Sequence, residues 1–137
     1  MTREEILKLK AGPELDRLIA ERVMEWRESS DFAIEKETGN LLKIDLSDSI
    51  FKGLWKWSPS TDVAAAWEVV EYMAQKQFDF TLSGHGEKYT VQVWNADPGA
   101  NRVRNPLATV YGPIPLAICQ AALLAVKEAD NEKKGGS

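Results

Sequence analysis

The sequence contains little of the chemistry on which most catalytic and metal sites depend. One cysteine, Cys119, and one histidine, His85, occur among 137 residues. A lone cysteine cannot form an internal disulfide, which is typical of a reducing cytosol. Metal sites need clustered Cys, His or carboxylate ligands, and Cys119 lies in an apolar segment where a thiol is usually inert. We therefore expect no metal, no cofactor and no enzymatic activity.

Long apolar segments and a strong net charge are also lacking. No run approaches the roughly 20 apolar residues that span a bilayer, and the acidic beginning, Met-Thr-Arg-Glu-Glu, has no signal-peptide core. The 17 basic and 21 acidic residues leave a net charge of −4, which does not favour long nucleic acids or anionic membranes. The sequence therefore predicts a cytoplasmic protein without a nucleic-acid or membrane partner.

The length of 137 residues predicts one domain. We place it at residues 1–130 and expect a flexible tail at 131–137, which ends in Gly-Gly-Ser.

The central stretch is a predicted helix that follows Pro59. Ser60 and Thr61 offer capping oxygens, and Asp62 adds negative charge to the first turn. Trp67 belongs to an apolar stripe at helical spacing and is expected to be buried against a sheet. The other members of the stripe are Val63, Ala66, Val70 and Met73.

The remaining patterns predict an α+β fold with an antiparallel sheet covered by helices. Helices are expected at 3–10, 13–27 and from Pro115 onward, and a hairpin is expected from two alternating runs at 78–82 and 88–95. A third strand is expected at 107–111. Residues 28–59 are harder to interpret, although 41–46 and 50–55 could each form a strand.

Trp55 and Trp57 alternate with Lys56, so both indoles could lie on one face of an extended segment. Two interpretations stay open for this pair. The indoles could close over the core, or they could form a stacking surface or a subunit interface. The second interpretation leads us to predict a homo-oligomer.

A polar loop after the second hairpin strand is the candidate binding site. It carries Asn95, Arg102 and Arg104, with Trp94 at its root and Lys88 earlier in the strand. Arginine binds phosphate oxygens, asparagine reads base edges or ribose hydroxyls, and tryptophan stacks on bases. The loop therefore has the side chains of a nucleotide-binding site, although a merely solubilising loop is the alternative.

Three strands followed by a helix also occur in double-stranded-RNA-binding modules. Those modules place lysines at the start of the last helix, to grip phosphates. Here that helix begins Pro-Ile-Pro-Leu-Ala-Ile-Cys-Gln, without a basic residue. This interpretation is therefore disfavoured.

Two stretches, Ser60-Thr61-Asp62-Val63-Ala64-Ala65-Ala66-Trp67-Glu68-Val69-Val70-Glu71 and the segment from Pro115 to Val126, resemble small bacteriophage proteins that carry the phage ABA sandwich domain. The beginning Met-Thr-Arg-Glu-Glu-Ile-Leu and the helix from Leu15 to Trp26 are similar as well. The resemblance implies an α-β-α layered sandwich with about three to five antiparallel strands. It carries over no site residues, because the loop from Asn95 to Asn105 and the segment from Ser29 to Trp57 do not match.

In size and layout these phage proteins are similar to anti-defence "sponge" proteins such as the Thoeris anti-defence proteins. That analogy implies an oligomeric immune-evasion protein of the host cytoplasm. It would bind a cyclic nucleotide or cyclic ADP-ribose-type second messenger and hold it without cleaving it. A small phage interaction or structural protein is the alternative, and metal-independent cleavage of a nucleotide is a third interpretation.

Overall fold

The computed structural model describes residues 1–45, 53–85, 88–95 and 106–135. Its helices and strands follow one another along the chain as α1 (Arg3–Leu7), α2 (Pro13–Leu18), the π-helix η1 (Ile19–Val23), β1 (Phe32–Ile34), β2 (Leu41–Asp45), β3 (Gly53–Lys56), α3 (Val63–Gln75), β4 (Phe78–His85), β5 (Lys88–Asn95), β6 (Ala108–Gly112) and α4 (Ile114–Gly135).

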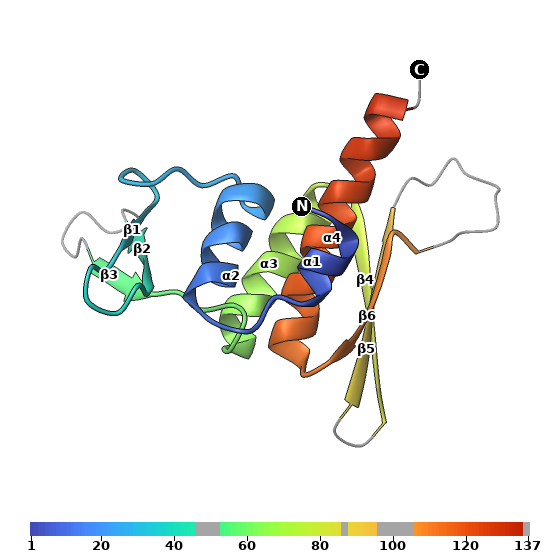
Figure 1. Cartoon of the computed structure of the whole chain (residues 1–137), viewed down its shortest axis with the longest axis horizontal. Helices are drawn as coiled ribbons and strands as arrows, with labels where there is room; N and C mark the ends of the chain where they lie inside the picture. Colours follow the sequence, from blue (N-terminus) through green and yellow to red (C-terminus); the bar gives the residue numbers. More distant parts are fainter. Residues whose placement is uncertain (46–52, 86–87, 96–105, 136–137) are drawn as a thin grey trace.

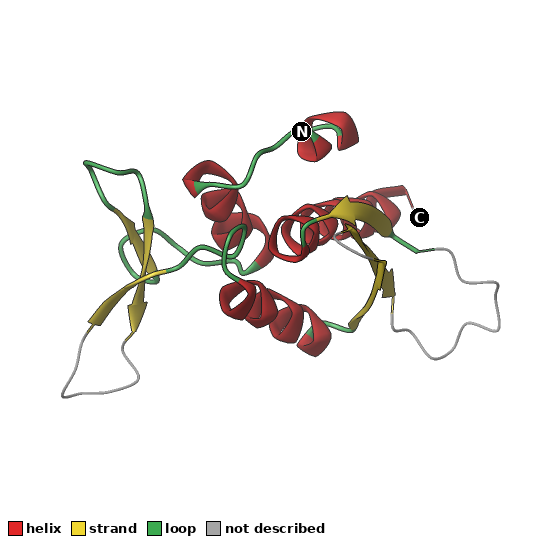
Figure 2. Cartoon of the chain, turned by 90° about the horizontal axis from the view of Figure 1, so that it is seen from below, coloured by secondary structure: helices red, strands yellow, loops and turns green. Residues whose placement is uncertain are grey.

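The described strands form two three-stranded antiparallel sheets, in the orders β1-β2-β3 and β4-β5-β6. The helices lie between the two sheets (Figure 1). Viewed from below, the β4–β6 sheet has helices on one side (Figure 2). The predicted α+β class, with antiparallel strands covered by helices, is confirmed. The strands divide into two sheets because the 28–59 segment contributes three strands of its own.

Helix α4 is the centre of the packing. It contacts β5 and β6 on one side, and α1, η1 and α3 on others. The inner face of the β4–β6 sheet presents Val91, Val93 and Val110 to it, all of them buried. Residues 117–125 of α4 are all buried, which explains why this part is rich in small apolar residues that let its neighbours approach closely. Helix α4 therefore packs across β5 and β6, while the central helix, which the sequence led us to expect on the sheet, contacts it through β4.

Helix α3 forms where predicted, but its buried face is different. Ala65, Ala66, Val69, Val70 and Met73 face inward against α4. Trp67 remains 48 % exposed and Val63 is exposed as well, so the prediction that Trp67 is a core residue is wrong. Ala65 and Ala66 allow close approach of α3 to α4, and this contact leaves the Trp67 indole on the outward face.

The N-terminal helices begin as predicted and end earlier. The Thr2 hydroxyl accepts a hydrogen bond from the Glu5 N–H at 3.2 Å, as the capping-box spacing indicates. The second helix begins at Pro13 and ends at Val23, because Glu25 adopts a left-handed φ of 59° and Trp26 N–H donates back to the Ala20 carbonyl at 2.8 Å. The predicted end near residue 27 was therefore too late.

The strand predictions are largely confirmed. The hairpin pairs Phe78 with Asn95 at one end and His85 with Lys88 at the other. β2 matches the expected strand at 41–46, and β6 matches the one at 107–111. Of the expected strand at 50–55, residues 53–55 belong to β3, while 46–52 lie outside the described residues.

The two tryptophans near β3 have different surroundings. Trp57 is 3 % exposed, and its ring centroid lies 4.5 Å from that of Trp26. Its indole N–H donates to Glu68 Oε2 at 3.0 Å. Trp55 is 62 % exposed. Closure over the core is therefore correct for Trp57 and wrong for Trp55.

Candidate functional site

The residues of the predicted nucleotide site are only partly described. Arg102 and Arg104 lie outside the described residues, and Lys88 is placed by its backbone at the start of β5. Trp94 and Asn95 form the end of β5. Because neighbouring residues of a strand point to opposite faces, these two side chains do not share one cavity.

Trp94 belongs to the outer face of the β4–β6 sheet. It pairs with Asp79 across the hairpin, and its indole N–H donates to the Thr81 hydroxyl at 3.1 Å. This hydrogen bond fixes the indole against β4. Stacking of Trp94 on a base stays a prediction.

Asn95 points to the helical side, into a hollow of about 420 Å³. The hollow lies where β5 ends, next to the start of the predicted loop. Its walls combine cations (Arg22, Lys76), carboxylates (Glu25, Asp130), aromatic rings (Tyr72, Phe78) and apolar side chains of η1 and α4.

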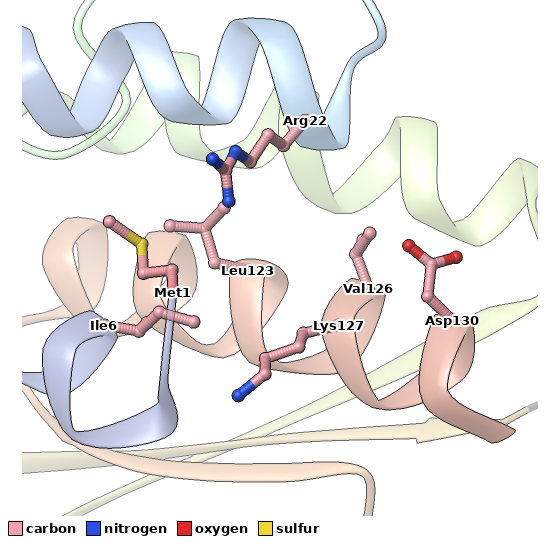
Figure 3. A pocket seen from close by; sticks show the side chains of 7 residues that line it. All are labelled: Met1, Ile6, Arg22, Leu123, Val126, Lys127 and Asp130. Carbon is pink, nitrogen blue, oxygen red and sulfur yellow. The ribbon is translucent and has the colours of Figure 1, made fainter. Parts of the chain in front are cut away.

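A second hollow, of about 430 Å³, adjoins the first along α4. Both share Arg22, Val126 and Asp130 as walls. Figure 3 shows Arg22 reaching from η1 toward α4, which supplies Leu123, Val126, Lys127 and Asp130, while Met1 and Ile6 come from the N-terminal segment. We call the two hollows together the α4 groove.

The charges of the α4 groove are unevenly paired. The Tyr72 hydroxyl donates to Glu25 Oε2 at 2.9 Å, and Lys76 Nζ lies 4.0 Å from the same oxygen. Arg22 and Lys127 form no ion pair with any residue in the described ranges. Glu25 is thus already engaged, and the two cations remain available to an anion.

Two helices end at the hollow of about 420 Å³ that Asn95 lines, which we call the Asn95 hollow. η1 ends at Val23 and α3 at Gln75, and the left-handed residues Glu25 and Gln77 that follow them both line the hollow. Helix C-termini carry partial negative charge, which disfavours an anion close by. A phosphate is therefore better placed at the Arg22 and Lys127 side of the groove than beside Tyr72.

The nucleophilic groups near the groove are weak. Burial raises the pKa of the Tyr72 hydroxyl above its ordinary value, and the hydrogen bond to Glu25 raises it further. Cys119 lies in the core, where burial and the charge of Asp16 raise the pKa of its thiol well above the ordinary value. Among the described residues no group of three His, Cys or acidic side chains is arranged to hold a metal ion.

The family follows from a comparison that covers most of the chain. Residues 17–123 match the family model of the phage ABA sandwich domain. The chain belongs to the phage ABA sandwich domain family. It is thus a small bacteriophage protein, as the resemblance of the two helical stretches predicts. Comparisons with curated proteins and with solved structures give no match.

Most of the α4 groove of this phage ABA sandwich domain was not foreseen from the sequence. Arg22, Tyr72 and Lys127 occupy ordinary polar positions of amphipathic helices, where a solvated surface is the usual interpretation. They converge only because three helices meet here. Asn95 is the one predicted site residue that the described groove includes. Over the described ranges, no helix combines the length and the apolarity required to cross a bilayer.

Proposed function

We propose that this phage protein is an immune-evasion protein that binds and sequesters a cyclic nucleotide or cyclic ADP-ribose-type second messenger without cleaving it. One observation carries the proposal. In the α4 groove, Arg22 lines both hollows. It accompanies the rings of Tyr72 and Phe78 in the hollow next to the point where the Arg102 and Arg104 loop begins, and it accompanies Lys127 in the adjoining hollow. Cations beside aromatic rings are the side chains that phosphates and bases require.

The two hollows suit different parts of such a ligand. Each lies within the range of about 300–1,000 Å³ typical of small-molecule sites. The Asn95 hollow, with Tyr72, Phe78 and the helix C-termini, favours the uncharged base and ribose. The side lined by Arg22 and Lys127 favours the phosphates, through charge-assisted hydrogen bonds.

Binding without cleavage is supported by the lining of the groove. The described walls include no histidine, cysteine, serine or threonine. The one hydroxyl side chain in the described walls, Tyr72, donates to Glu25, and burial together with this hydrogen bond raises its pKa. Cleavage requires a nucleophile with a general base at hydrogen-bond distance. Tyr72 with Glu25 has that spacing, but a phenol of raised pKa is a poor source of the nucleophilic anion.

The first experiment is a thermal-shift panel of cyclic mononucleotides, cyclic dinucleotides and cyclic ADP-ribose isomers, followed by calorimetry on the best binder. A ligand at about 100 times its Kd stabilises the native state by about 2.7 kcal/mol. For a chain of this size, that stabilisation raises Tm by about 10 °C. No shift with any member of the panel contradicts the proposal.

Variants then locate the site. Arg22→Ala should weaken binding by about 10- to 100-fold, because one charged hydrogen-bonding partner is lost. Arg27→Ala is the matched control, since Arg27 is exposed and lines neither hollow.

The double substitution Arg102→Ala with Arg104→Ala should abolish sequestration with the fold intact. Unchanged affinity in that double variant would remove the loop from the site.

Recovery of the ligand separates sequestration from catalysis. The bound nucleotide should be released with an unchanged mass when the protein is heat-denatured. A chemically altered nucleotide after incubation would make the protein an enzyme.

A second candidate function is a phage interaction protein that acts through protein contacts. Leu54, Trp55, Val63 and Trp67 are all exposed, and exposed tryptophans are frequent hot spots of interfaces. This function predicts that one defined partner co-purifies from infected cells with the parent and is lost with Trp67→Ser. The nucleotide panel would then give no shift.

A further inference from the structure

Strand β3 is an exposed edge of the β1–β3 sheet. It pairs with β2 on one side, and no described strand pairs with it on the other. Leu54 is 59 % exposed and Trp55 is 62 % exposed. Natural proteins usually protect such edges, because an unpaired edge is a template for pairing with another chain. β3 is short and carries one lysine, Lys56, but it also presents two large apolar side chains.

The register of β3 defines which backbone groups face outward. Trp57 N–H donates to the Leu41 carbonyl at 3.0 Å, and Trp55 lies opposite Lys43 two residues earlier. In an antiparallel ladder, hydrogen-bonded pairs recur at every second residue. Residues 53, 55 and 57 therefore bond to β2, and the N–H and C=O groups of Leu54 and Lys56 point away from it.

We propose that two copies of this chain form a dimer by antiparallel pairing of their β3 edges, around a two-fold axis at Trp55. In this register Leu54 lies opposite Lys56 of the partner subunit, and Lys56 lies opposite Leu54 of the partner subunit. Four backbone hydrogen bonds result, because each pair exchanges two. The two three-stranded sheets become one sheet of six strands.

The edge is suited to a copy of itself. A two-fold axis perpendicular to the sheet pairs residue numbers of equal parity, so the outward groups of 54 and 56 meet each other. Trp55 then faces Trp55 of the partner subunit in the pair without hydrogen bonds, where side chains are closest and aromatic pairs are favourable. A hollow of about 300 Å³ beside Trp55 leaves room for the second ring.

The charges near this axis are compatible with self-association. Lys56 and Asp62 both line the hollow beside Trp55, and neither forms an ion pair within the described part of the chain. A surface that pairs with its own copy should carry charges of both signs, because charges of a single sign would repel each other across the interface. Lys56 on one subunit and Asp62 on the other provide opposite signs across the axis.

The first test measures mass by light scattering coupled to size exclusion. The parent should have twice the 15.3 kDa mass of one chain. Leu54→Pro should give the single-chain mass with an unchanged circular dichroism spectrum, because it removes an outward N–H and leaves the β2 ladder intact. A parent at the mass of one chain overturns the proposal, as does a folded Leu54→Pro variant that stays dimeric.

A disulfide test does not depend on the Leu54→Pro variant folding. Trp55→Cys should form an intermolecular disulfide under mild oxidation, since the two positions face each other at the axis. Cys119 is buried and does not interfere. Tyr111→Cys is the matched control, because Tyr111 is 72 % exposed on β6, an edge of the other sheet. Cross-linking at position 111 in place of 55, or equally at both, overturns the β3 interface.

Discussion

Trp57 and Trp67 have the same indole in opposite surroundings. Trp57 is buried, packs on Trp26 and donates to Glu68, while Trp67 is half exposed on α3. Trp57→Ala should lower the free energy of unfolding by about 3–5 kcal/mol, since it leaves a cavity and removes one of the hydrogen bonds to Glu68. Trp67→Ala should cost roughly 1 kcal/mol or less.

Urea denaturation of both variants checks this pair. Each variant serves as the control of the other, because the deleted side chain is identical. Equal losses of stability, or a larger loss for Trp67→Ala, would contradict the burial described for α3.

The two indoles also show how far sequence can specify a helix face. Val63, Ala66, Trp67, Val70 and Met73 form a plausible stripe at helical spacing, and three of these five are buried. The choice between neighbouring stripes depends on which face α4 contacts, and that contact is long-range. Periodicity predicts that a helix forms, and the contact with α4 determines which of its faces is buried.

At the level of elements, Asp16 connects α2 by hydrogen bonds to the turn before α3. The side chain is 2 % exposed. Its two oxygens accept from the Ser60 N–H at 2.9 Å and the Ser58 hydroxyl at 3.0 Å. Ser60 Oγ in turn accepts from the Gly12 N–H at 2.9 Å, just before α2. The residues at 58–60 thus position two helix starts relative to each other.

The buried Asp16 carboxyl group predicts a specific pH dependence of stability. Burial raises the pKa of Asp16 above 3.8, although the hydrogen bonds from Ser60 and Ser58 oppose the shift. A carboxyl group whose pKa is higher in the folded state binds more protons in that state than in the unfolded state. Its contribution to stability is therefore fully present below pH 3.8 and is lost as the pH rises through the folded-state pKa. Relative to Asp16→Asn, the parent should therefore gain unfolding free energy as the pH falls from neutral.

Urea denaturation of the parent and Asp16→Asn at several pH values measures this difference, with other titrating groups cancelling between the two proteins. A difference that is constant, or that shrinks as the pH falls, would contradict the effect of burial on Asp16.

The sequence predicted the start of α3 but not its geometry. Asp62 is the N-cap, and its side chain accepts from the Ala64 N–H at 3.1 Å. Ser60 and Thr61, the expected caps, instead bond within the turn and to the α2 region. Local patterns place the elements because capping and periodicity are local. They do not place the α4 groove, whose walls come from the N-terminal segment, η1, α3, the β4–β5 hairpin and α4.

At the level of the whole molecule, the two proposed surfaces involve different elements. The walls of the α4 groove include no residue of β1, β2 or β3, among the residues described. The proposed dimer axis lies at Trp55 on β3, and Figure 1 shows the β1–β3 sheet at one end of the molecule, with α2 and α3 between it and α4. Sites that share no contacts usually contribute independently.

Dimer formation and ligand binding should therefore be uncoupled. The monomeric Leu54→Pro variant should bind the nucleotide selected by the thermal-shift panel with the parent's affinity, within about twofold, and with one ligand per chain. Calorimetry on the two proteins gives both quantities. A large loss of affinity in the folded monomer, or one ligand per two chains in the parent, would mean that the site is completed by the second copy. The groove described here would then be half of a shared site.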